Sequence, residues 1–122
     1  MMSRRTSGQR NYQVGLAAED IVRRRYLEEG YELDRSRWRG ISGEIDLIFR
    51  RGAEVVFAEV KASRDFARAA QALSSRQLTR ISGAAEEYLA RTFGHCDVDC
   101  RIDLALVDGQ GRSQILENVS MP

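Results

Sequence analysis

Apolar residues recur along this chain with two different spacings, and each spacing predicts one kind of element. A stripe with apolar residues three or four positions apart predicts a helix over residues 12–29, which Gly30 ends. The same spacing later predicts a second long helix, carried by Leu78, Ile81, Ala85, Tyr88 and Leu89. Alternating or continuous apolar runs predict strands over residues 31–38, 44–50, 53–61, 98–106 and 113–119. The expected order is therefore helix, three strands, helix, two strands.

The connections between these elements indicate how the strands pair. Only Arg51-Gly52 separates the second predicted strand from the third, so these two strands should form an antiparallel hairpin. A polar loop over residues 62–74 then leads to the second helix. We expect an α/β fold with a mixed central sheet of about five strands flanked by helices, built as a single domain over residues 12–119.

Composition and charge limit the classes of protein to which this chain can belong. The 122 residues are 43% hydrophobic and carry a net charge of +1, which allows one core and excludes a general polycation. Residues 1–11 contain Arg4, Arg5 and Arg10 without an acid, so we expect a disordered basic arm there. No stretch is long and apolar enough to span a membrane. We expect a cytoplasmic protein.

One basic residue differs from all the others. Lys61 is the only lysine among the nineteen Lys and Arg residues, and it ends an apolar strand. Lysine offers a compact charge on a flexible stem and a pKa that burial can shift, whereas arginine offers neither. Glu59 lies two residues earlier, so alternation along the strand puts both charges on the face that carries Val55 and Phe57. The single lysine in this arginine-rich chain therefore suggests a position where the bulkier guanidinium group of arginine would not serve.

A further acid lies in the preceding strand. Asp46 follows Ile45 and precedes Leu47, and alternation places its side chain on the face opposite to these two. The predicted hairpin can bring Asp46 across from Glu59. Charged groups in apolar strands are costly unless they are paired or bind a metal. We therefore interpret these acids and Lys61 as one site.

The residue types suit metal-dependent hydrolysis of a phosphodiester. Carboxylates at the edge of an apolar sheet supply the oxygen ligands that Mg²⁺ prefers, with Mn²⁺ as the alternative ion, and a bound metal lowers the pKa of its water. Lys61 can orient the attacking water or neutralise charge that develops on the phosphate. Glu19 on the first helix is the candidate third acid, because Gly15 one turn earlier leaves room for close approach.

Each of these residues also has an ordinary structural interpretation. Glu59 and Lys61 can form an ion pair at the end of a sheet, and a short motif alone has a high rate of false matches. Asp46 can cap a turn or pair with an arginine. Glu19 can be an acid on the surface of a helix. These interpretations become weaker when all four residues have to be explained together.

Two stretches carry a resemblance to known proteins: GEIDLI over residues 43–48 and FAEVK over residues 57–61. Further matches are Gly15, Ala18, Glu19, Gly30-Tyr31, Arg76-Gln77, Arg80-Ile81, Ala84-Ala85, Tyr88-Leu89 and residues 100–103. With these matches the chain resembles the YraN-like family of small bacterial proteins. That family is similar to archaeal Holliday junction resolvases of the PD-(D/E)-x-K, restriction-endonuclease-like superfamily. The resemblance implies a restriction-endonuclease-like fold.

The resemblance also implies roles for individual residues. Asp46 and Glu59 would be metal ligands, Lys61 the catalytic lysine and Glu19 the acid on the helix. Gln77 and Arg80, on the second long helix, would face substrate phosphates. The chain departs from the family pattern two residues after the lysine, where the family commonly has arginine and this chain has a serine, followed by Arg64. That departure concerns a local phosphate contact.

Arginines form a second candidate surface on the first predicted strand. Arg35, Arg37 and Arg39 alternate, so in a regular strand all three would point to one face. Such a row could follow a phosphate backbone, and each neutralised phosphate would release counterions. An exposed edge strand whose charges prevent aggregation explains the same pattern equally well.

These observations favour a magnesium-dependent endonuclease that acts on DNA, with branched or otherwise structured DNA as a candidate substrate. One alternative is a nucleic-acid-binding module with the same fold and no catalytic activity. Another is a non-enzymatic interaction protein, because fold and function separate easily. We expect DNA as the partner and leave a homodimer open as the assembly.

Overall fold

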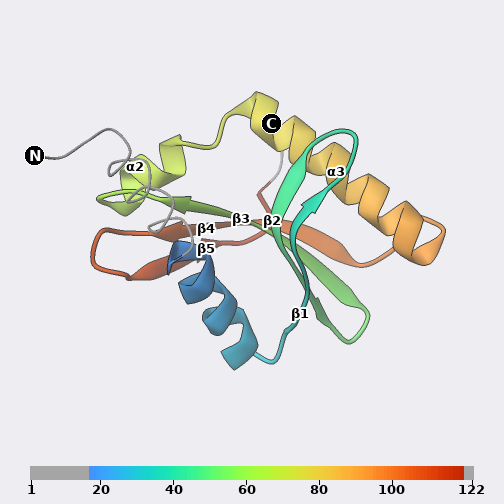
Figure 1. Cartoon of the computed structure of the whole chain (residues 1–122), viewed down its shortest axis with the longest axis horizontal. Coiled ribbons are helices and arrows are strands. Elements are labelled where there is room, and N and C mark those ends of the chain that lie inside the picture. Colours follow the sequence, from blue (N-terminus) through green and yellow to red (C-terminus); the bar gives the residue numbers. More distant parts are fainter. Residues whose placement is uncertain (1–16, 120–122) are drawn as a thin grey trace, which may run out of the picture.

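Five strands pair in their order along the chain and form one mixed sheet (Figure 1). They are β1 (Glu32–Arg39), β2 (Glu44–Arg51), β3 (Glu54–Ala62), β4 (Cys100–Val107) and β5 (Ser113–Leu116). All neighbouring strands are antiparallel except β3 and β4, which run parallel. The computed structural model describes residues 17–119, so the predicted basic arm and the predicted start of the first helix lie outside the described residues. The predicted α/β fold, mixed sheet and β2–β3 hairpin are confirmed.

Helices cover both faces of this sheet because each helix has one apolar stripe to bury. The first helix, described over residues 17–28, packs Ala18, Val22 and Tyr26 against one face. On the other face lies α3 (Ser75–Phe93), which buries the predicted stripe of Leu78, Ile81, Ala85, Tyr88 and Leu89. The order of helix, three strands, helix and two strands is as predicted.

One helix was not predicted. The segment expected to be a polar loop contains α2 (Phe66–Gln71), which buries Ala69 beneath it and packs on Leu104 and Leu106 of β4. Asp65 caps this helix by accepting a 2.8 Å hydrogen bond from the Arg68 N–H. Six residues give fewer than two helical turns, so α2 depends on burial against the sheet rather than on its own periodicity.

The alternation of β3 positions the candidate site. Val55 and Phe57 lie in the cluster under α3, whereas Val56 and Ala58 lie in the cluster under the first helix. Apolar residues therefore fill both faces of β3, as the sequence predicts for a central strand. After Glu54 at its start, the next charged residues of this strand are Glu59 and Lys61 near its end, and both line the cavity described below.

Besides a register shift between Leu33 and Arg35, the alternation of β1 and β2 breaks beside Arg37. Leu47 pairs with Ser36 and lies under the first helix, whereas Ile45 pairs with Trp38 and lies under α3. Ile45 and Leu47 therefore occupy opposite faces, and the prediction that they share one face is wrong. On both strands the side chains switch to the other face of the sheet between the pairs Ser36–Leu47 and Trp38–Ile45. Asp46 lies at this switch.

The backbone gives a reason for this switch. Arg37, between the paired residues Ser36 and Trp38, has a φ of 52°, in the left-handed region that non-glycine residues rarely adopt. After the switch, Trp38 packs edge-on against Tyr88 of α3, with ring centroids 5.7 Å apart. Trp38 is thus a packing residue. Within residues 17–119, no helix is long and apolar enough to cross a membrane.

Candidate functional site

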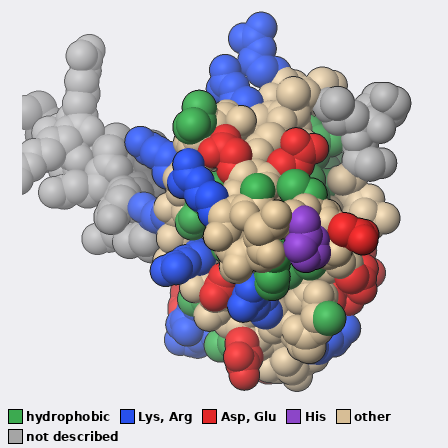
Figure 2. All heavy atoms as spheres, turned by 90° about the vertical axis from the view of Figure 1, so that its right-hand side faces the viewer, with side chains coloured by type: hydrophobic (Ala, Val, Ile, Leu, Met, Phe, Trp, Pro, Cys, Tyr) green, Lys and Arg blue, Asp and Glu red, His purple; other side chains and the backbone are tan. Residues whose placement is uncertain are grey.

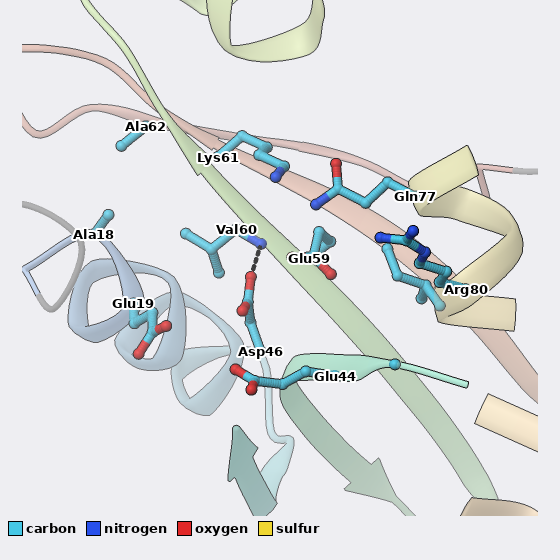
Figure 3. Close-up of a pocket in the computed structure, with 12 residues that line it drawn as sticks. Ala18, Glu19, Glu44, Asp46, Glu59, Val60, Lys61, Ala62, Gln77 and Arg80 are labelled. Carbon is cyan, nitrogen blue, oxygen red and sulfur yellow. Dashed lines mark hydrogen bonds between the residues drawn. The ribbon is translucent and has the colours of Figure 1, made fainter. Parts of the chain in front are cut away.

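A cavity of about 460 Å³ opens at the end of β3, between the first helix and α3 (Figure 3). The first helix, the start of β2, the end of β3 and the first turns of α3 all contribute to its wall. The predicted site residues that line this cavity are Glu19, Asp46, Glu59, Lys61, Gln77 and Arg80. The fold therefore brings together residues that are up to 61 positions apart in the chain, from Glu19 to Arg80.

Glu59 is the most deeply buried charged group of this cavity. Its exposed fraction is 6%, because the strand that carries it lies in the middle of the sheet. Its Oε2 atom is buried and accepts no hydrogen bond within the described part of the chain. A buried carboxylate oxygen without a partner loses its hydration and gains nothing in return. Such an atom is a candidate ligand for something that enters the cavity.

Asp46 is held beside Glu59 by the backbone. The regular pairing of β2 with β3 ends at Leu47 and Ala58, so continuing the register by one position places Asp46 across from Glu59. Beyond that point the Val60 N–H donates a 2.8 Å hydrogen bond to Asp46 Oδ2 (Figure 3). This bond fixes the orientation of the carboxylate at the mouth of the hairpin. The predicted approach of Asp46 to Glu59 across the hairpin is confirmed.

Burial and the neighbouring Asp46 strongly perturb the Glu59 carboxyl group. The pKa of Glu59 is raised from 4.5 to about 9; burial is the largest cause, followed by a hydrogen bond with Asp46 and the charge of Asp46. Lys61 acts in the opposite direction, because its positive charge favours the ionised carboxylate. A proton or a cation is therefore needed at Glu59 near neutral pH.

Glu19 contributes a third acid from the other side of the cavity. Burial raises its pKa, the charge of Arg37 lowers it, and the charge of Asp46 raises it again. The Arg37 Nε atom lies 3.4 Å from Glu19 Oε2, and the Glu19 side chain is 19% exposed. Glu19 therefore shares an electrostatic environment with Asp46, although it does not touch Glu59 in any contact that the structure records.

Basic and amide groups close the cavity on the side of α3. Figure 3 shows the Lys61 ammonium and the Gln77 side chain pointing toward one another, and the Arg80 side chain extending from α3 toward Glu59. Ser74 caps α3 and accepts a 3.1 Å hydrogen bond from the Gln77 N–H, which fixes the first turn of this helix at the cavity. Carboxylates on one side and cationic groups on the other suit a ligand with both a metal and phosphate oxygens.

Most of this chain matches one known protein family. The family described as "Uncharacterised protein family UPF0102" matches residues 18–107, which contain every residue that lines the cavity. The chain belongs to this family. The YraN-like resemblance drawn from the GEIDLI and FAEVK stretches is thereby confirmed.

Close relatives extend over nearly the whole chain. A UPF0102 protein of Ruegeria pomeroyi is 56% identical over 91% of this chain and 90% of its own length. A UPF0102 protein of Cereibacter sphaeroides is 51% identical over 92% of this chain and 96% of its own length. One from Dinoroseobacter shibae is 44% identical over 98% of this chain and 89% of its own length.

The predicted arginine row of this UPF0102 protein does not line the cavity. The left-handed backbone at Arg37, in the middle of the row, interrupts the regular alternation that the row requires. Arg37 contacts Glu19, and Arg39 lies 3.0 Å from Glu44. The expectation of one regular face is therefore wrong, because Ser36 lies beside the first helix and Trp38 packs under α3, so the strand changes faces within the row.

Sequence reasoning overlooked Glu44 as part of the site. Glu44 lines the cavity, and its charge contributes to the raised pKa of both Glu59 and Glu19. The signal was available, because Glu44 precedes Asp46 by two residues in the same strand. Its ion pair with Arg39 leaves the Glu44 side chain 38% exposed at the rim.

The chemistry of these groups fits a hard divalent cation. Glu59 Oε2 has no hydrogen-bond partner among residues 17–119, and Asp46 lies beside it with one oxygen bound to the Val60 N–H. Carboxylate oxygens are the ligands that Mg²⁺ and Mn²⁺ take in phosphate-processing sites, with water and substrate completing the shell. Among residues 17–119, no group of three or more His, Cys, Asp or Glu side chains is already arranged around one point. Asp46 and Glu59 are thus the two residues that would hold a metal.

Proposed function

We propose that this UPF0102 protein is a metal-dependent endonuclease that hydrolyses phosphodiester bonds in DNA. The observation that supports this most directly is the buried Glu59 oxygen without a partner, which faces the same cavity as Asp46 and Lys61. A folded protein tolerates an unsatisfied buried carboxylate when a ligand compensates for it. Branched or otherwise structured DNA is the substrate class that we propose for this site.

The side chains divide the chemistry among them. Mg²⁺ or Mn²⁺, when bound by Asp46 and Glu59, would polarise the phosphate and lower the pKa of a water. The Val60 N–H keeps the Asp46 carboxylate in place, so this ligand does not have to be ordered on binding. Lys61 can hold the attacking water or a phosphate oxygen with its compact ammonium group.

The α3 residues would bind the substrate rather than carry out the chemistry. Arg80 can form two parallel hydrogen bonds to a phosphate, and Gln77 can donate one through its amide. Both come from the capped start of α3 and line the same cavity as Lys61. Their position supports a phosphodiester that enters along α3, with the acids of β2 and β3 beneath it.

One observation favours a second candidate function. The described part of the chain, residues 17–119, brings no three metal-binding side chains around one point. A protein that binds DNA through Arg80, Gln77 and Lys61 without hydrolysing it would need no such arrangement. The second candidate is therefore a nucleic-acid-binding module without turnover.

A cleavage assay separates the two candidates. Labelled single-stranded, linear duplex, forked and four-way-junction DNA would be incubated with Mg²⁺ or Mn²⁺ and with EDTA. We expect metal-dependent cleavage by the wild type and by Asp97→Asn, which changes an exposed loop residue, but none by Asp46→Asn. Binding of these substrates without cleavage would support the second candidate. Neither binding nor cleavage would refute both.

A further inference from the structure

The turn between β1 and β2 presents an apolar side chain to solvent. Ile41 at its tip is 91% exposed, whereas the other exposed large hydrophobics of residues 17–119, Leu27, Leu33 and Phe93, are 37–41% exposed. A single exposed apolar residue is common on protein surfaces and needs no explanation by itself. The way in which this residue is held, and its position beside the cavity, distinguish it from the others.

Glu87 of α3 fixes the backbone of this turn. Its two carboxylate oxygens accept hydrogen bonds from the Ile41 and Ser42 N–H groups, each 2.7 Å long. These two bonds hold the pKa of Glu87 below its usual value, so the carboxylate stays charged and binds strongly. The Gly40 N–H also donates to the Gly43 carbonyl at 2.9 Å. The turn is therefore held in place while its tip stays exposed.

Small residues bring the turn close to α3. A methyl group built onto Gly83 of α3 would lie 2.8 Å from the Ser42 side chain, and one on Gly43 would lie 3.2 Å from the Arg80 Cβ. Figure 1 shows the turn lying alongside α3. The tip is thus seated against the same helix that carries Gln77 and Arg80 into the cavity.

The tip is also close to the proposed reaction centre along the chain. Gly43 lines the cavity and follows Ile41 by two residues, which span at most roughly 7 Å. That length corresponds to about two base-pair rises of 3.4 Å. A nucleic acid whose phosphodiester occupies the cavity would therefore have a neighbouring base step within reach of Ile41.

We propose that Ile41 is a wedge that enters an unstacked base step of structured DNA while the adjacent phosphodiester lies in the cavity. This inference rests on the proposed function and specifies its substrate as DNA with a junction, fork or bulge. Proteins that kink nucleic acid insert single Ile, Leu, Phe or Met side chains between bases in this way. Bases that are already unpaired are the cheapest to separate, which gives the preference for structured DNA.

The surroundings of Ile41 favour DNA over a protein partner. Stable protein interfaces bury roughly 800 Å² on each side, which a lone isoleucine does not provide. On the face that carries the end of α3, charged side chains of both signs alternate with small, separate hydrophobic areas (Figure 2). Arg39 and Arg91 lie near the turn, with side chains 78% and 59% exposed, and they can contact phosphates.

Fluorescence of 2-aminopurine tests the wedge without catalysis. The base would be placed next to the branch of a forked DNA, and binding would be measured in EDTA with the full chain. We expect the wild type and Ile41→Leu to raise the fluorescence and to prefer the fork over a linear duplex. Ile41→Ala should lose the rise and on the order of tenfold in that preference. Glu87→Gln, which weakens the hydrogen bonds that hold the turn, should lose part of the fluorescence rise and part of the preference for the fork.

Controls separate this inference from the proposed function. Leu27→Ala removes an exposed leucine from the first helix and should behave as the wild type. A normal fluorescence rise with Ile41→Ala, or no rise with the wild type, would overturn the wedge even if Mg²⁺-dependent cleavage occurs. A rise with the wild type that Ile41→Ala loses would support the wedge even if no cleavage occurs. Loss of self-association alone in Ile41→Ala, seen by sedimentation, would overturn it in favour of a contact between two copies.

Discussion

The Tyr26 hydroxyl donates a 2.7 Å hydrogen bond to the fully buried Asp103 carboxylate and thereby joins the first helix to β4. Asp103 also accepts hydrogen bonds from Arg101 Nε at 3.0 Å and from the Asn118 N–H at 3.0 Å. Glu19 lies seven residues before Tyr26, two helical turns earlier on the same side of the helix. This buried contact therefore sets the rotation of the helix that brings Glu19 to the cavity.

Tyr26→Phe should lower the free energy of unfolding by about 1–2 kcal/mol, because it leaves one Asp103 oxygen with fewer donors inside the protein. Urea denaturation monitored by circular dichroism would measure the change. Tyr31→Phe is the matched control: its hydroxyl donates a 2.6 Å bond to Glu54, which is only partly buried, so its loss should cost less. An effect of Tyr26→Phe no larger than that of Tyr31→Phe would contradict the anchoring role.

Replacing the buried acid should make the protein more stable at neutral and alkaline pH. The pKa of Glu59 is raised from 4.5 to about 9 by burial first, so the folded state holds a proton that the unfolded state releases within this window. The wild type consequently loses stability as pH rises from about 4.5 to 9, by at most about 1.4 kcal/mol per pH unit. Glu59→Gln has no proton to lose and should gain a few kcal/mol relative to the wild type over this range.

Thermal or urea unfolding at pH values from 4 to 9 would check this result in metal-free buffer. Glu86→Gln, which changes an exposed glutamate on α3, is the control and should follow the wild type. Parallel curves for the wild type and Glu59→Gln across the whole range would show that burial imposes no cost on this carboxylate.

The regular parts of the fold could be predicted from sequence because their periodicity is uninterrupted. On β3 the two-residue period correctly places Phe57 and Val56 on opposite faces, which the structure packs against α3 and the first helix respectively. The same rule fails for Ile45 and Leu47, because the left-handed residue Arg37 and its neighbours on β2 reverse the faces. This left-handed conformation leaves no periodic signal, and the arginine that adopts it does not mark the position, because non-glycine residues rarely take it.

The sequence predicts which residues form most of the candidate site, but it does not predict how these residues contact one another. The lone lysine at residue 61 and the two acids in apolar strands stand out because such strands bury charges only at a cost. The unpartnered Glu59 oxygen could not be predicted, because it depends on Asp46 binding the Val60 N–H and on the end of the hairpin register. The turn held by Glu87 likewise joins residues 46 and 45 positions apart.

Arg80 should account for part of the salt dependence of DNA binding. If its guanidinium contacts a phosphate in the cavity, Arg80→Ala should weaken binding to every DNA sequence and reduce the slope of log K against log salt by about one. Arg51→Ala is the control, because that guanidinium lies 4.1 Å from the Tyr31 ring centroid and does not line the cavity. Filter binding or fluorescence anisotropy would measure these slopes at salt concentrations of roughly 50 to 200 mM. An unchanged slope for Arg80→Ala would place the phosphate elsewhere.

The last prediction concerns the lone lysine. Lys61 lines the cavity beside Glu59, and its charge favours the ionised form of that carboxylate. If this pairing were its whole role, Lys61→Arg would be tolerated, since arginine keeps the charge and binds carboxylates well. If Lys61 instead holds a water or a phosphate oxygen, the larger planar guanidinium displaces the reacting group. A displacement of about 1 Å can cost on the order of a hundredfold in rate.

We therefore expect Lys61→Arg to fold, to bind DNA with nearly the wild-type affinity and to lose about 99% of metal-dependent cleavage. Circular dichroism, anisotropy and single-turnover cleavage would measure the three properties on one preparation. Arg80→Lys provides the converse control, because it makes the opposite exchange of basic residues on the other wall of the cavity and should weaken binding more than the cleavage step. Cleavage by Lys61→Arg at the wild-type rate would exclude a catalytic role for the lysine. If this variant does not fold, Lys61 has a structural role, because folding would then require a small cationic group beside the Glu59 carboxylate.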